Sequence, residues 1–239
     1  LVDAGATCRK LVQSLEAHGL SAEAVQGICI THTHTAHIKG LRVFLNQHPV
    51  PVYGTSETLA QLRELDKIPQ NADLREILPA ETIHTDTVAV TAFATMHDSP
   101  GSCGYRFELS DGQTCAVCTD LGCVTPEVKK GVYGADLVLL EANYDPNMLR
   151  NGPYPEMLQE RIRVKYGHLS NGDSAGMAEA LIAHGTTRLI LGHLSENNNT
   201  MPLAQQTVLE HLQEQGMRRN QDFLLQVSSP EGLKQAVIF

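Results

Sequence analysis

The sequence predicts an α/β fold in which a pair of mixed β-sheets is sandwiched by helices. Strand-like runs alternate with helical patterns along most of the chain, but the middle block, residues 88 to 119, holds three strand-like runs in succession. Consecutive strands flanked by strand–helix units favour mixed sheets over a doubly wound parallel sheet. Because the 239 residues contain no internal repeat or low-complexity linker, we expect a single domain over residues 1–239.

Short runs rich in apolar and β-branched residues predict the strands. They span Val25–Ile30, Val50–Tyr53, Val88–Ala94, Gly104–Leu109, Thr114–Thr119, Leu137–Glu141, Arg188–Leu191, Phe223–Val227 and Gln235–Phe239. Apolar residues at helical spacing predict the helices. They span Thr7–His18, Ile38–Asn46, Ser56–Leu65, Pro126–Gly131, Tyr154–Tyr166, Gly172–His184 and Pro202–Gln215. Asp111-Gly112 predicts a hairpin turn inside the middle block.

Composition excludes several classes of protein. With 42% hydrophobic and 19% charged residues, the chain can bury a sizeable core. No apolar run approaches the roughly 18 to 20 residues of a membrane span, and the sequence starts with no signal peptide, so we expect a soluble, cytoplasmic protein that binds no membrane. The net charge of -9 argues against a broad basic face for nucleic acid. Bound divalent cations would nevertheless reverse the local charge at a phosphate site.

The six cysteines are predicted to be reduced and mostly buried, because most lie in or beside apolar runs. Cys115 and Cys118 are spaced like a metal-binding pair. They occupy a predicted strand, however, where an offset of three directs side chains to opposite faces, so we expect no shared metal.

Residues 31–40 read THTHTAHIKG, with three histidines directly after a buried strand. His32 and His34 alternate with threonines and can point the same way, and His37 begins the next helix. Other predicted strands also end in side chains that bind metals, namely His97, Asp120 and His193. Imidazole nitrogens and carboxylate oxygens gathered at strand ends predict a site for zinc or a similar cation. Asp3 either caps a turn or orients one of the ligand histidines.

These segments are similar to those of the metallo-β-lactamase-fold hydrolases, and most closely to their YycJ/WalJ branch. The resemblance covers nearly the whole chain and rests on residues 1–5, 31–40, 97–98, 119–122, 141–145, 167–171 and 193–198. It implies an αββα four-layer sandwich of two mixed sheets, whose first strands would precede Leu1. It also implies a two-metal site at the sheet edge, filled by zinc or manganese, with iron as a further option.

Carried over residue by residue, the resemblance assigns His32, His34 and His97 to the first metal and Asp120 to a bridge. It assigns His37 and His193 to the second metal, together with the aspartate of an H-x-H-x-D-H motif. Ala36 stands in that aspartate's place. We therefore expect at least one bound metal and a second site that is empty, weakly filled or completed by water. Nothing in the spacing supports Glu141 or Asp145 as a substitute.

The resemblance and the residues together suggest metal-assisted hydrolysis of a phosphodiester, with nucleic acid or a small phosphodiester as substrate. Gly167-His168-Leu169-Ser170 is similar in order and spacing to the H-S-T element of tRNA 3′-processing nucleases, so His168 is the candidate general acid. The alternative is that His168 caps the following helix. A last set would bind phosphate oxygens or serve only as helix caps, namely Ser170, Asn171, Ser195 and Asn197.

Two other functions stay open at this point. One is a different hydrolase of the same fold, such as a thioesterase or lactonase, because one fold hosts many chemistries. The other is a metal-binding protein with little or no catalysis, which is the interpretation that Ala36 favours.

Overall fold

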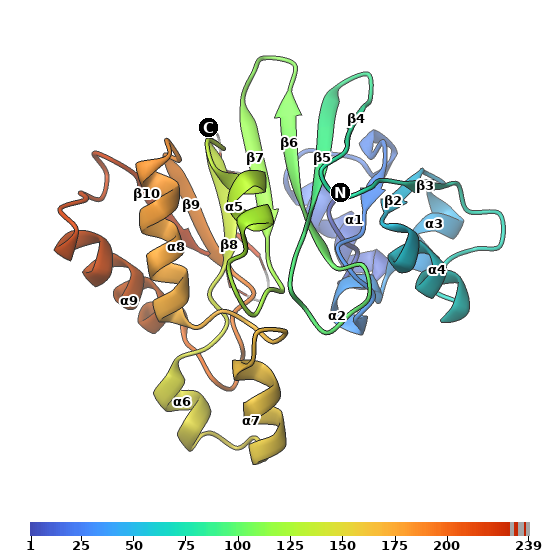
Figure 1. The fold of residues 1–239 in the computed structure, drawn as a ribbon. Helices are drawn as coiled ribbons and strands as arrows, with labels where there is room; N and C mark the ends of the chain where they lie inside the picture. Colours follow the sequence, from blue (N-terminus) through green and yellow to red (C-terminus); the bar gives the residue numbers. More distant parts are fainter. Residues whose placement is uncertain (230–231, 234–236, 238–239) are drawn as a thin grey trace. The chain divides into compact units, whose positions relative to one another are not determined.

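The computed structural model describes residues 1–229, 232–233 and 237, and it divides the chain into two compact units. The first unit holds residues 1–83 and 99–103, and the second holds residues 84–98 and 104–239. Each unit is built around one sheet with helices beside it (Figure 1). The predicted pair of sheets flanked by helices is confirmed. The single domain over residues 1–239 stays a prediction.

The sheet of the first unit is small and parallel, with the order β1-β2-β3. Its strands are β1 (Ile28–Cys29), β2 (Val52–Gly54) and β3 (Leu74–Glu76). The longer helices beside it are α1 (Cys8–Ala17), α3 (Leu41–Gln47) and α4 (Ser56–Glu64). Their apolar faces join Ile28 and Ile30 in a buried core. Thr7 and Thr55 begin α1 and α4 because their hydroxyls accept hydrogen bonds from first-turn N–H groups.

The larger sheet, most of whose residues belong to the second unit, has the order β10-β9-β8-β7-β6-β5-β4. Its strands are β4 (Thr82–His84), β5 (Val88–Ala94), β6 (Cys103–Leu109), β7 (Thr114–Cys118), β8 (Leu137–Glu141), β9 (Arg188–Gly192) and β10 (Leu224–Val227). β6 and β7 form the predicted antiparallel hairpin, where Gly112 takes a φ of 88° that its turn requires. β7 to β10 run parallel, so the carboxyl ends of these strands lie along one sheet edge.

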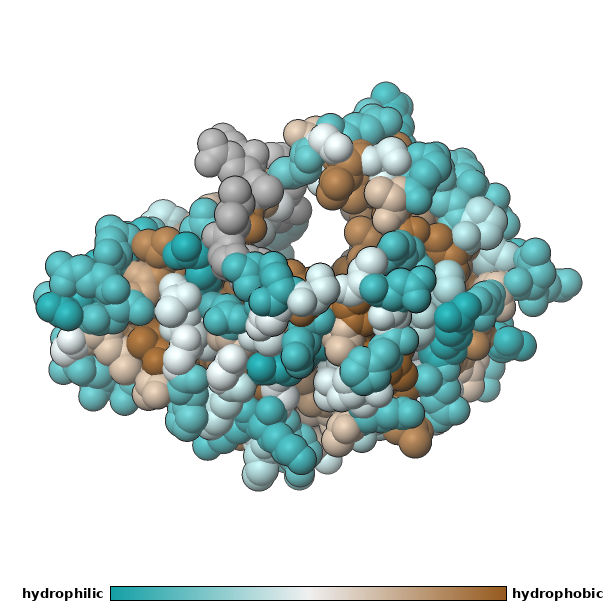
Figure 2. Space-filling model, turned by 90° about the horizontal axis from the view of Figure 1, so that it is seen from above, coloured by the Kyte–Doolittle hydropathy of each residue, from teal (hydrophilic) through white to brown (hydrophobic). Residues whose placement is uncertain are grey.

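The helices of the second unit are α5 (Pro126–Val132), α6 (Pro146–Asn151), α7 (Glu156–Arg163), α8 (Asn171–Ala183) and α9 (Met201–Glu214). α8 and α9 lie side by side and pack on the sheet, where Leu140, Leu181 and Val208 belong to one buried core (Figure 1). α6 and α7 form a separate, smaller cluster around Leu149 and Ile162. Hydrophilic side chains cover much of the face shown in Figure 2. Within the described residues, no helix has the length and apolar character of a membrane span.

Several elements differ from their predicted bounds. The strand predicted at Val25–Ile30 forms β1 only over residues 28–29, and a short 3-10 helix, Ala22–Ala24, precedes the predicted segment. The helix predicted at Ile38–Asn46 is split into α2 (Thr35–Ile38) and α3. Gly40 lies at the break, where an added Cβ would stand 2.1 Å from the carbonyl oxygen of Ala6. That close approach comes from a distant segment, so the local pattern did not show it.

β3, β4 and α6 were not predicted, because each is short and carries no long apolar period. The strand predicted at Gln235–Phe239 lies outside the described residues, apart from position 237. The structure joins none of the six cysteines in a disulfide. Burial raises the pKa of the Cys29 thiol to about 12 and also raises that of Cys118, so both are neutral at pH 7. Along β7 burial alternates, which places Cys115 and Cys118 on opposite faces as predicted.

Candidate metal centre

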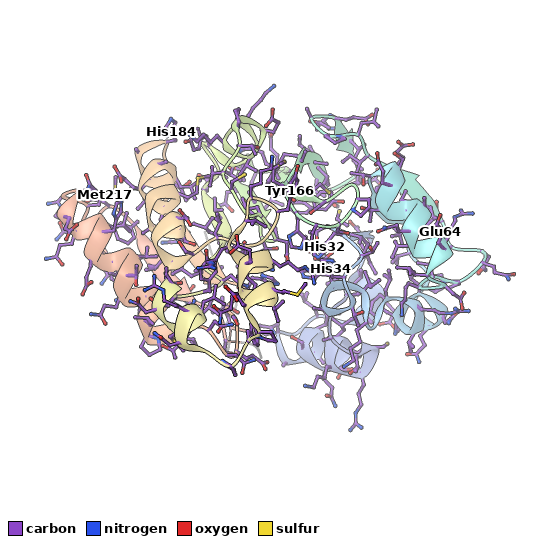
Figure 3. All side chains as sticks on the ribbon, turned by 60° about the horizontal axis from the view of Figure 1, so that its bottom comes forward. His32, His34, Glu64, Tyr166, His184 and Met217 are labelled. Atoms are coloured by element: carbon purple, nitrogen blue, oxygen red, sulfur yellow. The ribbon has the colours of Figure 1, made fainter. Side chains whose placement is uncertain are left out.

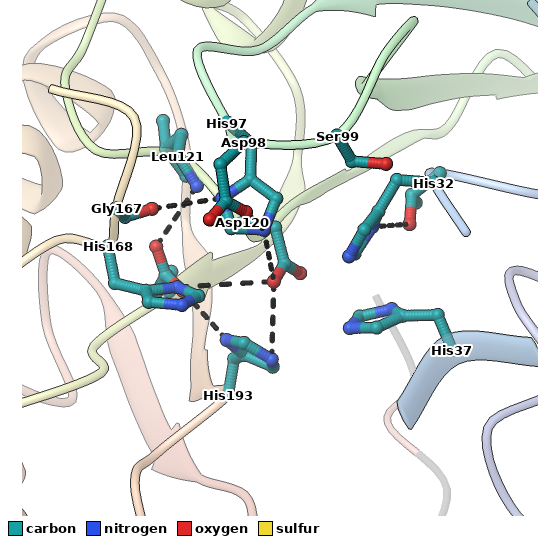
Figure 4. Close-up of polar contacts among 12 residues, drawn as sticks. His32, His37, His97, Asp98, Ser99, Asp120, Leu121, Gly167, His168 and His193 are labelled. Carbon is teal, nitrogen blue, oxygen red and sulfur yellow. Dashed lines mark hydrogen bonds and ion pairs between the residues drawn. The ribbon is translucent and has the colours of Figure 1, made fainter. Parts of the chain in front are cut away.

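Three of the predicted ligands meet at one edge of the second unit's sheet. Asp120 comes shortly after the end of β7, and His193 comes directly after β9. Because β7, β8 and β9 are parallel, their carboxyl ends share this edge, where β8 ends in Glu141. His97, from the loop after β5, lies beside them (Figure 4). The structure thus brings His97, Asp120 and His193 together.

Asp120 is the centre of this cluster. Its Oδ1 lies 3.4 Å from Nε2 of His193, 3.7 Å from Nε2 of His97 and 4.0 Å from Nδ1 of His168 (Figure 4). One donor atom from each of Asp120, Glu141, His168 and His193 lies within 4.8 Å of the other three. A buried carboxylate surrounded by imidazole nitrogens is a donor set that suits zinc and similar cations.

The imidazoles of His97 and His193, whose Nε2 atoms face Asp120, are each held through Nδ1. Nδ1 of His97 lies 3.0 Å from the carbonyl oxygen of Gly167, and Nδ1 of His193 lies 2.7 Å from Oε1 of Glu141. Both acceptors favour a proton on Nδ1, which leaves the lone pair on Nε2, the ring nitrogen that lies near Asp120. Burial lowers the pKa of His97, against the opposing charge of Asp120, and this favours the neutral imidazole that a metal ligand needs.

Glu141 is a shared hydrogen-bond acceptor within the cluster. Its Oε1 accepts hydrogen bonds from Nδ1 of His168 and of His193 at 2.8 and 2.7 Å, and its Oε2 accepts from the backbone N–H groups of Leu121 and Leu169. Burial alone would raise the pKa of Glu141, but the charge of His168 and the hydrogen bonds from both imidazoles lower it to about 2. The carboxylate therefore stays ionised although its side chain is fully buried.

The sequence analysis considered Glu141 only as a substitute for the ligand missing at position 36. It did not identify the residue as the shared hydrogen-bond partner of His168 and His193. The available signal was the composition of β8, which reads LVLLE, because a single charge at the end of an otherwise apolar strand needs a partner when it is buried.

The backbone at the cluster is held in an unusual conformation. Asp120 and His193 take φ values of 58° and 57°. Non-glycine residues rarely adopt this left-handed region, although Asp, Asn and His do so more often than other residues. Such conformations tend to gather at functional sites, where surrounding contacts enforce them. Asp120 and His193 thus lie in loops whose backbone geometry departs from that of regular strands.

The first unit holds a second set of hydrogen bonds, centred on Asp3, which also takes a positive φ of 57°. Oδ2 of Asp3 lies 2.7 Å from Nδ1 of His37 and from Oγ1 of Thr31, and Oδ1 accepts the N–H of Thr31. Oγ1 of Thr31 in turn lies 3.0 Å from Nδ1 of His32. These contacts are satisfied when His32 and His37 carry their protons on Nδ1, the tautomer in which Nε2 carries the lone pair that a metal ligand needs. Thr31 is a further site residue that the sequence analysis missed.

The three histidines of residues 31–40 lie close to one another. The ring centroid of His32 is 4.7 Å from that of His34 and 4.1 Å from that of His37. Figure 3 shows His32 and His34 side by side in the loop after β1. His32 and His37 are buried, whereas Ala36 is exposed. The spacing of the motif therefore does bring its imidazoles into one group within the first unit.

The segment that carries Ala36 and His37 is clamped by the turn at Asp3. The N–H of Ala4 donates to the carbonyl oxygen of His37 at 2.7 Å. A Cβ on Gly5 would stand 1.8 Å from the carbonyl oxygen of Ala36, so only glycine permits this approach. The opening residues thus fix the backbone of the histidine motif.

The predicted substrate-binding residues all make contacts within the protein. Ser170 is the N-cap of α8 and forms a capping box with Asp173, so the cap of this helix is not His168. The side-chain amide of Asn171 is fully buried and paired with that of Asn199. The other two contact neighbouring polar groups, Ser195 with Asn198 and Asn197 with Tyr154. Contact of these four residues with substrate stays a prediction.

Replacing Glu141 with glutamine should weaken metal binding about 10- to 100-fold, the usual cost of losing a hydrogen-bond partner of a ligand histidine. A neutral amide cannot accept from both imidazoles and from two backbone N–H groups as strongly as the carboxylate does. Isothermal titration of Zn²⁺ into the metal-free protein measures the loss. Glu214→Gln, at the exposed end of α9, is the control. An unchanged affinity in Glu141→Gln would contradict the positioning role.

The β-lactamase superfamily domain model matches residues 1–194. Exodeoxyribonuclease YycJ of Bacillus anthracis is 32% identical over 97% of this chain and 87% of its own length. Exodeoxyribonuclease WalJ of Streptococcus pneumoniae is 32% identical over 97% of this chain and 86% of its own length.

Among solved structures, the Zn²⁺-bound PqqB of Methylobacterium extorquens superposes with a TM-score of 0.69. It is 18% identical, and the match covers 97% of this chain and 81% of that one. At 18% identity this similarity shows a shared fold alone.

Proposed function

Because the chain belongs to the metallo-β-lactamase superfamily, and within it to the family of the YycJ and WalJ proteins, we propose that it is a metal-dependent phosphodiesterase acting on nucleic acid. The observation that carries the proposal is the position of Asp120, whose Oδ1 lies within 4 Å of ring nitrogens of His97, His168 and His193. The names of both relatives, exodeoxyribonuclease, support DNA as the substrate.

The donors in each unit fit divalent metal ions. In the second unit, His97 and His193 present Nε2 to the Asp120 carboxylate, and in the first unit His32 and His37 have Nδ1 occupied by protein acceptors. We propose the ligand assignment that the sequence resemblance implies. In that assignment His32, His34 and His97 would hold the first metal, His37 and His193 would hold the second, and Asp120 would contribute to both. Zinc or manganese bound there would polarise the phosphodiester and make a water molecule more acidic.

His168 is the proposed proton donor to the leaving oxygen. Its Nδ1 lies 2.8 Å from Oε1 of Glu141, so its Nε2 points away from Glu141. Its side chain is 21% exposed, so a substrate can reach it. A positioned general acid of this kind contributes about 10²- to 10⁴-fold to a reaction rate. Glu141 acts as a positioning residue, since its Oε1 accepts hydrogen bonds from Nδ1 of both His168 and His193.

Ala36 supports a second candidate function, a metal-binding protein with weak catalysis. The position is exposed and carries no donor atom, so the second metal has only His37, His193 and the shared Asp120 as protein ligands in this assignment. A thioesterase or lactonase activity has no comparable observation in its favour.

Incubation with Mn²⁺ or Zn²⁺ and 5′-labelled DNA and RNA oligonucleotides tests the proposed function. We expect metal-dependent shortening of the DNA, abolished by EDTA. A panel of thioesters and lactones is the control for other hydrolases of this fold. If neither DNA nor RNA is shortened by the protein or by its Ala36→Asp variant, the nuclease proposal is wrong.

A further inference from the structure

Tyr166 is an exposed aromatic side chain on a tightly held backbone. Tyr166 is 43% exposed as a residue, and it follows α7 in the segment that leads to His168. Lys165 places Nζ over the Tyr166 ring at 5.0 Å from its centroid. An exposed aromatic ring together with a lysine ammonium is the pair of groups that binds single-stranded nucleic acid, because one stacks on a base and the other contacts a phosphate.

The backbone around Tyr166 is fixed to the metal-binding cluster from both sides. The carbonyl oxygen of Gly167 accepts from Nδ1 of His97 at 3.0 Å. The backbone of Lys165 and Gly167 packs against Gly122, where an added Cβ would stand 2.4 Å from the Lys165 carbonyl carbon. Gly122 belongs to the loop that carries Asp120. The ring of Tyr166 is therefore displayed from a segment that touches the loops of two proposed ligands.

A third contact ties α7 to the same place. Nε of Arg161 lies 2.5 Å from Oδ2 of Asp98, the residue next to His97. Arg161 is thus paired with Asp98, whereas the ammonium group over the Tyr166 ring is that of the exposed Lys165. The whole arrangement lies within the second unit.

From this arrangement we propose that Tyr166 and Lys165 form a binding site for single-stranded nucleic acid beside the metal-binding cluster. Tyr166 stacks on a base and Lys165 binds a flanking phosphate. The inference rests on the proposed function for the identity of the substrate, and it adds that a nucleotide near the cleaved bond is bound as a single strand. It also accounts for binding by a protein with a net charge of -9, since stacking needs no broad basic face.

The chain has no tryptophan, so Tyr166→Trp creates a single fluorescent reporter at this position. Titration with oligo(dT) in EDTA should quench its emission, whereas Leu224→Trp, a similarly exposed position on β10, should show no change. Tyr166→Ala should weaken binding of fluorescein-labelled oligo(dT) about 5- to 150-fold, and Tyr166→Phe should keep it. Lys165→Gln should lower the slope of log Kd against log salt by about 0.7.

Circular dichroism and melting curves of every variant show whether the fold is kept. Quenching at position 166 but not at 224, with weaker binding in Tyr166→Ala, supports the site. Equal quenching at both positions, wild-type affinity in Tyr166→Ala, or equal affinity for duplex and single strand overturns it. Since these titrations contain EDTA, they do not depend on hydrolysis. Binding without any metal-dependent cleavage would therefore contradict the proposed function and leave the binding site standing.

Discussion

Asparagine at position 120 should reduce metal-dependent DNA cleavage more than about 100-fold. Mutating a residue that only hydrogen-bonds to a metal ligand commonly lowers activity about 10- to 100-fold, and replacing a proposed ligand should lower it further. The substitution removes a negative charge whose Oδ1 lies within 4 Å of Nε2 of both His97 and His193. Asparagine tolerates the positive φ of this position as well as aspartate does, so the loop after β7 should keep its conformation. Initial rates on labelled DNA, at saturating Mn²⁺, measure the effect.

The control for Asp120→Asn is Asp86→Asn, an identical chemical change at an exposed position between β4 and β5. It should leave both cleavage and metal affinity as they are. Metal-dependent cleavage by Asp120→Asn at a rate close to wild type would show that Asp120 is not a metal ligand.

Aspartate at position 36 should raise cleavage and tighten the second metal by at least about 10-fold, since it supplies a ligand carboxylate where the chain has a methyl group. Ala36 is exposed in α2, so the longer aspartate side chain meets no steric barrier there. The turn at Asp3 and Gly5 holds the backbone of this segment in place. The control is Thr35→Asp, at the neighbouring exposed position of α2. It adds the same negative charge, but its side chain points in a different direction.

Cleavage rates across a Mn²⁺ titration distinguish the two variants. A gain in Ala36→Asp that Thr35→Asp does not share assigns the effect to ligation. Equal rates in Ala36→Asp and in the unchanged protein would mean that position 36 contributes nothing to the metal site.

The grouping of several candidate residues could be predicted from the sequence because they stand at strand ends. Asp120 and His193 follow apolar strands whose parallel pairing brings their carboxyl ends to one edge, a consequence of the βα alternation. The close packing of His32, His34 and His37 likewise follows from their spacing. The positions of these candidate residues follow from local spacing and from strand pairing.

The supporting contacts could not be predicted in the same way. Glu141 lies 27 residues from His168 and 52 from His193, and no local pattern encodes their shared hydrogen bonds. Gly40 divides a predicted helix because of the carbonyl group of Ala6, which also comes from a separate segment. β3 is a strand only because it pairs with β2, as its own three residues have little strand character. Long-range partners decide these features.

Counting bound metals tests the central claim, that these donors hold one metal firmly and a second one weakly because of Ala36. Elemental analysis of the protein, purified without added metal and dialysed, should find about one zinc or manganese per chain, and dialysed Ala36→Asp about two. Two tightly retained ions in the unchanged chain, or none in either protein, would contradict this account.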